Sequence, residues 1–292
     1  RFIKNAFSSF VSPDVVKELM EHHERLALGG KSVNASVLFL DIAGFTTMSE
    51  QFEPPVLINI INNCLNEITE IVLKHDGMID KFIGDAVMAV WGAPAERDDH
   101  AYRACLAAIE IQNKMIEVAA EEKQRTGAEL AARIGINSGS MIAGNVGGHR
   151  RFEYTVHGND VNVASRLEGA NKFYATKIMI GENTAALLED QFNLRKLDSV
   201  RLKGKKEPIV LYELQCLSGK LSQQQEQCNQ CFEKGLELYK NGLWDEAIES
   251  FSKGLSYIKD DGPCLNMIER CKEFSVHSPV KNWGGVYDMT SK

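Results

Sequence analysis

The order of strand-like and helix-like segments is the feature that most limits what this chain can fold into. Short apolar runs bounded by turn residues predict buried strands, whereas apolar residues at helical spacing predict amphipathic helices. In the first half of the chain the two patterns alternate. They predict a strand at 35–40, a long helix from Pro54 to before Gly77, strands at 78–83 and 86–91 around Gly84-Asp85, and a second long helix after Asp98 and Asp99.

The same alternation continues to about residue 217. We expect strands at 130–137 and 141–146, joined by a turn at Ser138-Gly139-Ser140, and then a helix at 161–171. Three more short strands are expected near 177–180, 194–199 and 209–216. The order strand–helix–strand–strand–helix–strand is that of a ferredoxin-like βαββαβ core. We therefore predict an α+β fold with extra elements after the core.

The two ends of the chain differ from this core. Within the N-terminal connector segment 1–30 we predict a helix at 7–28, because Ser12, Pro13 and Asp14 are typical of a helix start. Gln and Ser dominate at 218–230, which indicates a linker. The patterns that follow predict a small all-α segment at 222–275, with helices at 232–240, 244–258 and 265–274, and a flexible tail at 276–292.

The all-α segment resembles a tetratricopeptide repeat. Gly235, Tyr239, Ala247 and Phe251 fall close to the spacing of that repeat, including its Ala-x3-Phe step. One repeat cannot bury its own apolar face. We therefore expect these helices to pack on the preceding domain or on a second copy of the chain.

Charge and cysteine content exclude several classes of function. The formal net charge of the 292 residues is −7, so non-specific binding to nucleic acid is not expected. The seven scattered cysteines indicate reduced thiols in a cytosolic compartment. Cys228 and Cys231 form a CxxC pair, but Cys264 and Cys271 lack the spacing of a second zinc-binding pair. No apolar run approaches the ~20 residues that span a bilayer.

Two carboxylates fall where catalytic groups are common. Asp41 ends the first predicted strand, and Asp85 lies at the tip of the predicted hairpin. In a ferredoxin-like sheet both would lie at one edge, where such oxygen ligands suit Mg²⁺ or Mn²⁺. For either aspartate alone, a solvated strand end is the simpler interpretation. Gly44 follows closely and can form a turn whose N–H groups face a polyphosphate.

Four sequence blocks extend this hypothesis. They are Phe-Leu-Asp-Ile-Ala-Gly-Phe-Thr-Thr at 39–47, Asp-Lys-Phe-Ile-Gly-Asp-Ala-Val-Met-Ala-Val at 80–90, Arg-Ile-Gly-Ile-Asn-Ser-Gly at 133–139 and Gly-Asn-Asp-Val-Asn-Val-Ala-Ser-Arg at 158–166. In order and spacing over residues 33–217 they resemble the signature motifs of class III adenylate and guanylate cyclase catalytic domains. The resemblance implies conversion of ATP to 3′,5′-cyclic AMP and pyrophosphate in intracellular signal transduction.

The resemblance also implies roles for individual residues. Asp41, Asp85 and the carbonyl of Ile42 match the ligands of two divalent cations, Mg²⁺ or Mn²⁺. Asn162 and Arg166, four apart on one helical face, match the catalytic pair that orients the ribose and stabilises charge on the α-phosphate. The positions that match substrate-binding residues are Arg133, Gly44, Phe45, Thr46, Gly84 and, within the basic cluster at 201–206, Lys205.

Base choice is assigned by the resemblance to Lys81 and Thr155. Lysine only donates hydrogen bonds and can serve adenine N1, and a threonine hydroxyl can accept one from the adenine amino group. These residues place the chain with the threonine-bearing bacterial subclass of adenylate cyclases. A guanylate cyclase of the same fold, which typically has Glu and Cys at these positions, remains the alternative.

Assembly and location follow from the same resemblance. In the family one chain supplies the cation ligands and the other the base-selecting and catalytic residues, and this chain carries both sets. The implied state is a homodimer with two equal sites. An upstream membrane-bound sensor is also implied, with a cytoplasmic catalytic region anchored to the inner face of the plasma membrane. A catalytically silent scaffold that binds a partner protein is the alternative from another class.

Overall fold

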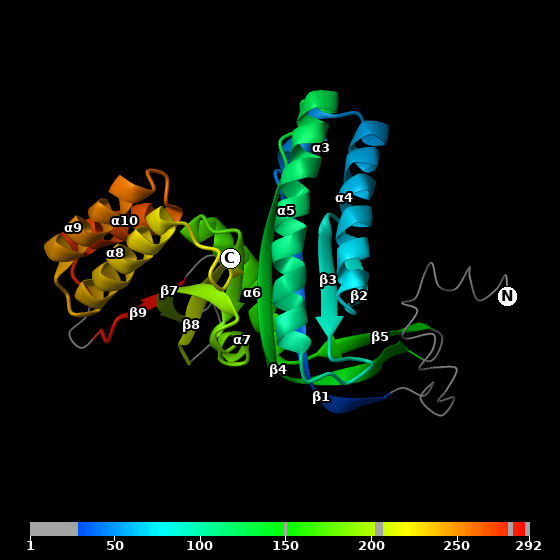
Figure 1. The fold of residues 1–292 in the computed structure, drawn as a ribbon. Helices are drawn as coiled ribbons and strands as arrows, with labels where there is room; N and C mark the ends of the chain where they lie inside the picture. Colours follow the sequence, from blue (N-terminus) through cyan, green and yellow to red (C-terminus); the bar gives the residue numbers. More distant parts are fainter. Residues whose placement is uncertain (1–28, 149–150, 202–206, 280–282, 290–292) are drawn as a thin grey trace. The chain divides into compact units, whose positions relative to one another are not determined.

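The computed structural model (Figure 1) describes residues 29–148, 151–201, 207–279 and 283–289, without the side chains of Thr46 and Arg151. The chain divides into two compact units, residues 1–165 (unit 1) and 166–292 (unit 2). The helix expected within residues 1–30 and the basic cluster around Lys205 lie outside the described residues.

Unit 1 is built on an antiparallel sheet with a long strand pair at its centre. β1 (Gly29–Ala43) pairs with β4 (Ala131–Gly148) along all of its 15 residues. β3 (Ala86–Trp91) pairs with the other side of β1, and β2 (Met78–Ile83) pairs with β3. β5 (Arg151–His157) pairs with the last residues of β4. The order β2-β3-β1-β4 confirms the predicted βαββαβ core.

Two long helices, α4 (Pro54–Lys74) and α5 (His100–Thr126), lie side by side in unit 1 (Figure 1). Asn63 on α4 donates a hydrogen bond to Glu122 on α5 at 3.1 Å. By length and composition alone, α4 is the one helix of the described chain that could cross a membrane. One face of α4 is apolar and buried inside the unit, as in the core helix of a globular domain, whereas Ile58 and Leu73 are exposed. The buried residues of α4 are Ile60, Ile61, Cys64, Ile68, Ile71 and Val72.

The turn predicted at Ser138-Gly139-Ser140 does not form, because β4 runs unbroken through these residues and pairs them with β1. Ser138 is fully buried, and its hydroxyl lies 2.6 Å from the hydroxyl of Ser36. A polar residue that would favour a turn is thus satisfied inside the strand. The short helix α3 (Phe45–Gln51) and strand β5 are additions that the sequence patterns do not predict.

Unit 2 contains four of the described strands and the C-terminal helices. Its strands follow the order β6-β8-β7-β9, in which only the β7–β9 pair is parallel. The three strands predicted before residue 217 and the three predicted helices are confirmed. The elements are the end of α6 (Asn159–Tyr174), β6 (Ile178–Gly181), α7 (Glu182–Ala186), β7 (Phe192–Arg201), β8 (Ile209–Leu217), α8 (Gln223–Lys240), α9 (Trp244–Tyr257), α10 (Gly262–Val276) and β9 (Val286–Asp288).

Two boundary predictions in unit 2 are wrong. The linker expected at 218–230 is largely helix, because α8 begins at Gln223 with a reciprocal capping box between Ser222 and Gln225. The tail expected to be flexible contains β9, and its Trp283 packs edge-on against Tyr239 with ring centroids 4.9 Å apart. Composition suggested loose chain in both places, whereas a cap and distant aromatic partners determine the structure.

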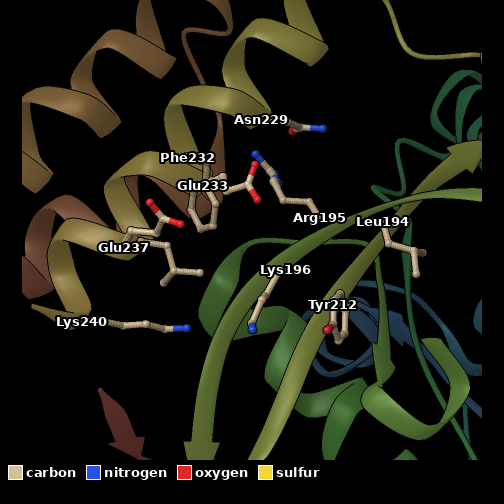
Figure 2. Close-up of a pocket in the computed structure, with 10 residues that line it drawn as sticks. Leu194, Arg195, Lys196, Tyr212, Asn229, Phe232, Glu233, Glu237 and Lys240 are labelled. Carbon is tan, nitrogen blue, oxygen red and sulfur yellow. The ribbon is translucent and has the colours of Figure 1, made fainter. Parts of the chain in front are cut away.

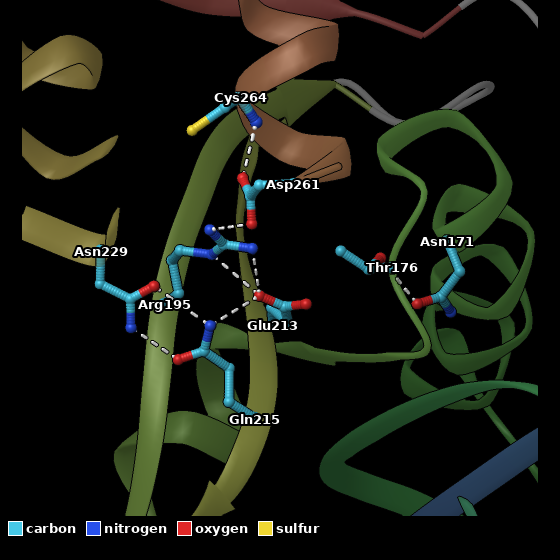
Figure 3. A network of polar contacts seen from close by, with 8 residues as sticks. All are labelled: Asn171, Thr176, Arg195, Glu213, Gln215, Asn229, Asp261 and Cys264. Carbon is cyan, nitrogen blue, oxygen red and sulfur yellow. Dashed lines mark hydrogen bonds and ion pairs between the residues drawn. The ribbon is translucent and has the colours of Figure 1, made fainter. Parts of the chain in front are cut away.

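A buried ion-pair network joins the C-terminal helices to β7 and β8 (Figure 3). Arg195 on β7 donates at 2.8 Å to Glu213 on β8 and at 2.8 Å to Asp261, the N-cap residue of α10. Gln215 on β8 exchanges two hydrogen bonds with Asn229 on α8. Because Arg195 is almost completely buried, its charge requires these carboxylates.

A second buried cluster centres on Arg270 of α10. Its guanidinium forms an ion pair with Asp198 on β7, and both side chains are almost completely buried. Tyr174 donates to the same carboxylate at 2.7 Å, and the ring centroid of Tyr287 on β9 lies 3.8 Å from the guanidinium carbon. The C-terminal helices therefore pack on the sheet of their own unit.

Candidate active site

Asp41, Asp85 and Arg133 come together in unit 1. Asp41 lies near the end of β1, directly opposite Arg133 on β4, and the guanidinium donates to Asp41 Oδ2 at 2.5 Å. Asp85 occupies the turn between β2 and β3 and interacts with the carboxyl group of Asp41 by charge and by hydrogen bonding. The two carboxylates therefore meet, as their places in the sequence predict.

The turn between β2 and β3 depends on glycine. Gly84 has a φ of +67°, in the left-handed region that residues with a Cβ rarely occupy. The turn leaves Asp85 only partly solvated, and burial is the main reason why its pKa is raised. The negative charge of Asp41 raises this pKa further, and the guanidinium of Arg133 partly opposes the rise. The carboxylate pair thus carries an unfavourable interaction that a cation would relieve.

The donor set fits a hard divalent cation. Asp41 and Asp85 offer carboxylate oxygens, the ligands that Mg²⁺ and Mn²⁺ prefer. Ile42 follows Asp41 on β1, and its hydrocarbon side chain has no ligand atom, so only its main-chain carbonyl could serve as a ligand.

Gly44 joins β1 to α3. Its φ of +92° lies in the left-handed region, and its carbonyl accepts a hydrogen bond from Met48 N at 2.9 Å. A Cβ here would lie 3.3 Å from the carbonyl oxygen of Glu129, so glycine also avoids a close contact. The expected glycine turn is therefore the start of a short helix. Phe45 and Thr46 occupy its first turn, where main-chain N–H groups lack partners within the helix.

Lys81 and Thr155 belong to one polar cluster. Lys81 Nζ on β2 lies 2.9 Å from Glu153 on β5 and 3.4 Å from Asp80. Thr155 on β5 is buried and donates to Asp80 at 2.6 Å. Asp80 and Glu153 are not among the predicted site residues. The sequence patterns do not indicate that Asp80 is buried beside Thr155, and Glu153 lies on a strand that they do not predict.

The start of α6 is fixed by β4. Asn137 on β4 donates to the carboxylate of Asp160 at 3.0 Å. A Cβ on Gly139 would lie 2.4 Å from the same carboxylate, so glycine at this strand position leaves room for the Asp160 side chain. The sequence block at 133–139 therefore positions the block at 158–166.

Asn162 and Arg166 lie one turn apart on α6. Asn162 is exposed, whereas Arg166 is half-buried. Among the residues that the structure describes, Arg166 Nη1 is a buried donor without a hydrogen-bond partner. Arg166 is the first residue of unit 2, and the other described site candidates belong to unit 1. Lys205 lies outside the described residues, so the structure gives no position for it.

Unit 2 contains a pocket of about 420 Å³ that none of the predicted site residues line (Figure 2). It lies among β7, β8 and α8, and Figure 2 shows the amino groups of Lys196 and Lys240 turned toward each other. The pKa of Lys240 is lowered, mainly by burial and further by the charge of Lys196. This pocket is a separate feature from the carboxylate pair of unit 1.

Cys228, Asp261 and Cys264 of unit 2 also come together, with ligand atoms within 4.8 Å of one another. One oxygen of Asp261 accepts a hydrogen bond from Arg195, and the other accepts from the main-chain N–H of Cys264. The carboxylate is thus occupied as a helix cap and as an ion-pair partner. These two bonds of Asp261 explain the cluster as part of the packing of α10 on β7.

Comparisons with known proteins agree with the carboxylate site. Residues 30–216 match the family of the adenylate and guanylate cyclase catalytic domain. Adenylate cyclase 1 of Rhizobium meliloti (strain 1021) is 32% identical over 211 residues, which are 71% of this chain and 31% of that protein. The adenylyl cyclase CyaB from P. aeruginosa is 33% identical, with a TM-score of 0.62 over 67% of this chain and 100% of that one. The guanylyl cyclase Cya2 is 29% identical, with a TM-score of 0.62 over 67% and 98%.

Proposed function

This chain belongs to the adenylate and guanylate cyclase catalytic domain family, and we propose that it converts ATP to 3′,5′-cyclic AMP and pyrophosphate. The observation that carries the proposal is the meeting of Asp41 and Asp85 beside Arg133. A carboxylate pair for cations next to a fixed guanidinium is suited to a polyphosphate substrate. The chain spans less than a third of the Rhizobium relative, so the activity is proposed for this chain on its own residues.

Two divalent cations, Mg²⁺ or Mn²⁺, held by Asp41, Asp85 and the carbonyl of Ile42, would activate the ribose 3′-hydroxyl and neutralise the departing pyrophosphate. Arg133, oriented by its bond to Asp41, donates to the triphosphate. Main-chain N–H groups next to the carboxylates assist in holding the phosphates. We assign this role to Gly44, Phe45, Thr46 and Gly84, and a role at the terminal phosphates to Lys205.

Arg166 and Asn162 are assigned to the reacting centre. The buried Nη1 of Arg166 needs an acceptor, and an α-phosphate oxygen that gains charge in the transition state is a suitable one. A planar guanidinium can donate to two oxygens at once. Asn162, one turn earlier and exposed, orients the ribose. The two roles agree with their spacing on one helix.

We assign ATP rather than GTP as the substrate on the residues of the base pocket, because the similar structures include both an adenylyl and a guanylyl cyclase. Lys81 and Thr155 lie in one cluster through Asp80, so both side chains can face the same purine. Lysine donates to adenine N1, and the threonine oxygen accepts from the adenine amino group. This assignment places the chain in the threonine-bearing bacterial subclass.

We propose that two copies of the chain form the sites together. Large apolar side chains on β2, β4 and β5 of unit 1 are exposed, which is typical of a protein–protein interface. In the proposed two-fold dimer, one protomer supplies the carboxylates and Arg133, and its partner supplies the base-selecting and catalytic residues. The exposed side chains are Phe82, Ile83, Ile142, Val146 and Phe152.

We also propose roles for the segments on either side of the catalytic domain. Gly235 of α8 lies against Phe251 of α9, where a Cβ would be 2.6 Å from the ring, and this close packing supports a tetratricopeptide-like hairpin. The chain covers 31% of the Rhizobium relative, so a member of the family can carry further sequence, and we propose an upstream sensor as such an addition. We propose that this sensor is membrane-bound and that the catalytic region lies on the cytoplasmic face.

The deciding experiment is product identification. The purified chain is incubated with ATP or GTP and Mn²⁺ or Mg²⁺, and products are separated by chromatography and identified by mass. We expect cyclic AMP and pyrophosphate in equal amounts, and none from Asp85→Asn. Cyclic GMP as the main product would establish the guanylate cyclase alternative. A folded dimer that makes neither product would refute the proposal and favour the silent scaffold.

A further inference from the structure

Asp80 is a fully buried carboxylate that the proposed roles leave unused. Ionisable side chains are seldom buried without a partner that requires them. The register between β2 and β3 shifts between Ile79 and Lys81, so Asp80 is the extra residue of a β-bulge. Bulges re-aim side chains next to functional sites. Here the bulge lets consecutive residues approach each other, with Lys81 Nζ 3.4 Å from Asp80 Oδ1.

The two oxygens of Asp80 have different partners. Oδ2 accepts the hydroxyl hydrogen of Thr155 at 2.6 Å. Oδ1 is buried beside Lys81, its ion-pair partner, and the main-chain N–H of Val156 also donates a hydrogen bond to this carboxylate. Glu153 holds the same ammonium group at 2.9 Å from the other strand. The lysine is therefore fixed beside Oδ1, and Thr155 beside Oδ2.

The direction of the hydrogen bond between Thr155 and Asp80 has a chemical consequence. Burial raises the pKa of Asp80, and the hydrogen bond from Thr155 and the charge of Lys81 oppose this rise by favouring the ionised form. The ionised carboxylate only accepts hydrogen bonds, so Thr155 gives its one hydroxyl hydrogen to Asp80. The hydroxyl oxygen then keeps only lone pairs for any ligand. At the six position, adenine carries an amino donor, whereas guanine carries a carbonyl acceptor. A threonine held in this way can accept from adenine but has no hydrogen to offer guanine.

We propose that Asp80 is a positioning residue for base selection, because it fixes the hydroxyl hydrogen of Thr155 and so turns Thr155 into an acceptor that favours adenine over guanine. The inference rests on the proposed nucleotide site. It makes a specific prediction for an isosteric change. In Asp80→Asn, the fixed ammonium of Lys81 attracts the new amide oxygen, which turns the amide NH₂ toward Thr155. Thr155 must then accept, and its hydrogen becomes free for guanine.

The test is a double-mutant cycle of Asp80→Asn and Thr155→Val, read as the ratio of kcat/KM for ATP to kcat/KM for GTP. In Asp80→Asn, Thr155 loses the hydrogen bond that it accepts from the adenine amino group and can donate one to the guanine carbonyl instead. We expect this exchange to lower the ratio roughly tenfold. In the Thr155→Val background there is no hydroxyl to orient, so Asp80→Asn should leave the ratio unchanged. Asp76→Asn, on the exposed turn before β2, is the matched control and should keep the parental ratio.

An unchanged ratio in Asp80→Asn, or an equal fall in both backgrounds, would overturn the inference without touching the proposed activity. If Asp80→Asn does not fold, Thr155→Asn replaces it. Its amide must donate to Asp80 and present its oxygen, so the ATP preference should persist, and its loss counts against the inference. The ratio of the affinities for ATP and GTP analogues that lack the 3′-hydroxyl measures the same base preference without turnover. A wild-type chain that shows no purine preference in either assay also overturns it.

Discussion

Replacing Arg270 with methionine should strongly destabilise unit 2, because the change leaves the carboxylate of Asp198 buried without its cation. Methionine keeps much of the side-chain volume, so the loss of charge dominates over the loss of packing. The Asp198 side chain is 0% exposed and that of Arg270 is 3% exposed. Water cannot replace the guanidinium at such a site, and only the hydrogen bonds from Tyr174 and from the main-chain N–H of Ser199 remain.

The magnitude follows from the burial. Removing one partner of a buried ion pair typically costs about 3–5 kcal/mol. The substitution also removes the contact between the Arg270 guanidinium and the ring of Tyr287. Because Tyr287 lies on β9, this loss weakens the pairing of β9 with β7. For a cooperative unit of this size such a loss lowers Tm by roughly 6–20 °C. The double variant Arg270→Met, Asp198→Asn removes both charges and should recover about 2 kcal/mol or more.

The assay is urea denaturation followed by tryptophan fluorescence, because Trp244 and Trp283 both lie in unit 2 and pack with their rings 5.6 Å apart. Lys272→Met on the same helix is the matched control. Its exposed ion pair with Glu269 should contribute less than about 1 kcal/mol. The reasoning is refuted if Arg270→Met falls within 1 kcal/mol of the parent, or if the double variant is no more stable than the single one.

Three further predictions concern the site and its pH dependence. Asp85→Asn should abolish cyclic nucleotide formation yet be at least as stable to heat in EDTA as the parent, because it removes the repulsion with Asp41; a clear fall in Tm would contradict this. Asp41→Ala and Arg166→Ala, each nearly inactive, should together regain roughly a quarter of parental activity when co-expressed, since half of randomly paired dimers have one intact site; heterodimers without activity would exclude a shared site. Burial lowers the pKa of His100, which the charges of Asp98 and Asp99 oppose only partly, so its neutral form stabilises the fold above pH ~6.5 and this contribution is lost as pH falls below that value. His100→Asn should therefore flatten the dependence of Tm on pH between 5 and 7, and an unchanged slope would assign it to other groups.

The core of the fold could be predicted because each element is coded locally. The Pro54-Pro55 helix start and the apolar spacing of α4 required no knowledge of partners, and Gly84 marks the hairpin whose strands the structure places at 78–83 and 86–91. The meeting of Asp41 with Asp85 follows from strand order alone. These features depend on sequence neighbours or on topology, both of which the sequence displays.

The errors share a different physical origin. Ser138 is predicted to lie in a turn because serine is common in turns. In the structure its hydroxyl instead forms a hydrogen bond with Ser36, on a strand 102 positions away in the sequence. The tail after residue 276 is predicted to be flexible from its composition. In the structure Trp283 and Tyr287 contact an aromatic ring and a guanidinium group in other elements. The burial of Asp80 could not be predicted, because it depends on a β-bulge in β2 and on a hydrogen bond from Thr155 on β5. Such pairings between distant residues cannot be deduced from a single sequence.

The long ladder between β1 and β4 has a consequence for how the protein matures. Asp41 and Arg133 pair across 92 positions of sequence, so the loop between them must close before either gains its partner. During synthesis the hairpin with Asp85 and both long helices emerge before β4 does. The nascent chain therefore carries its acidic pair before the strand that completes the cluster. The two carboxylates therefore gain the guanidinium of Arg133 only once β4 has paired with β1.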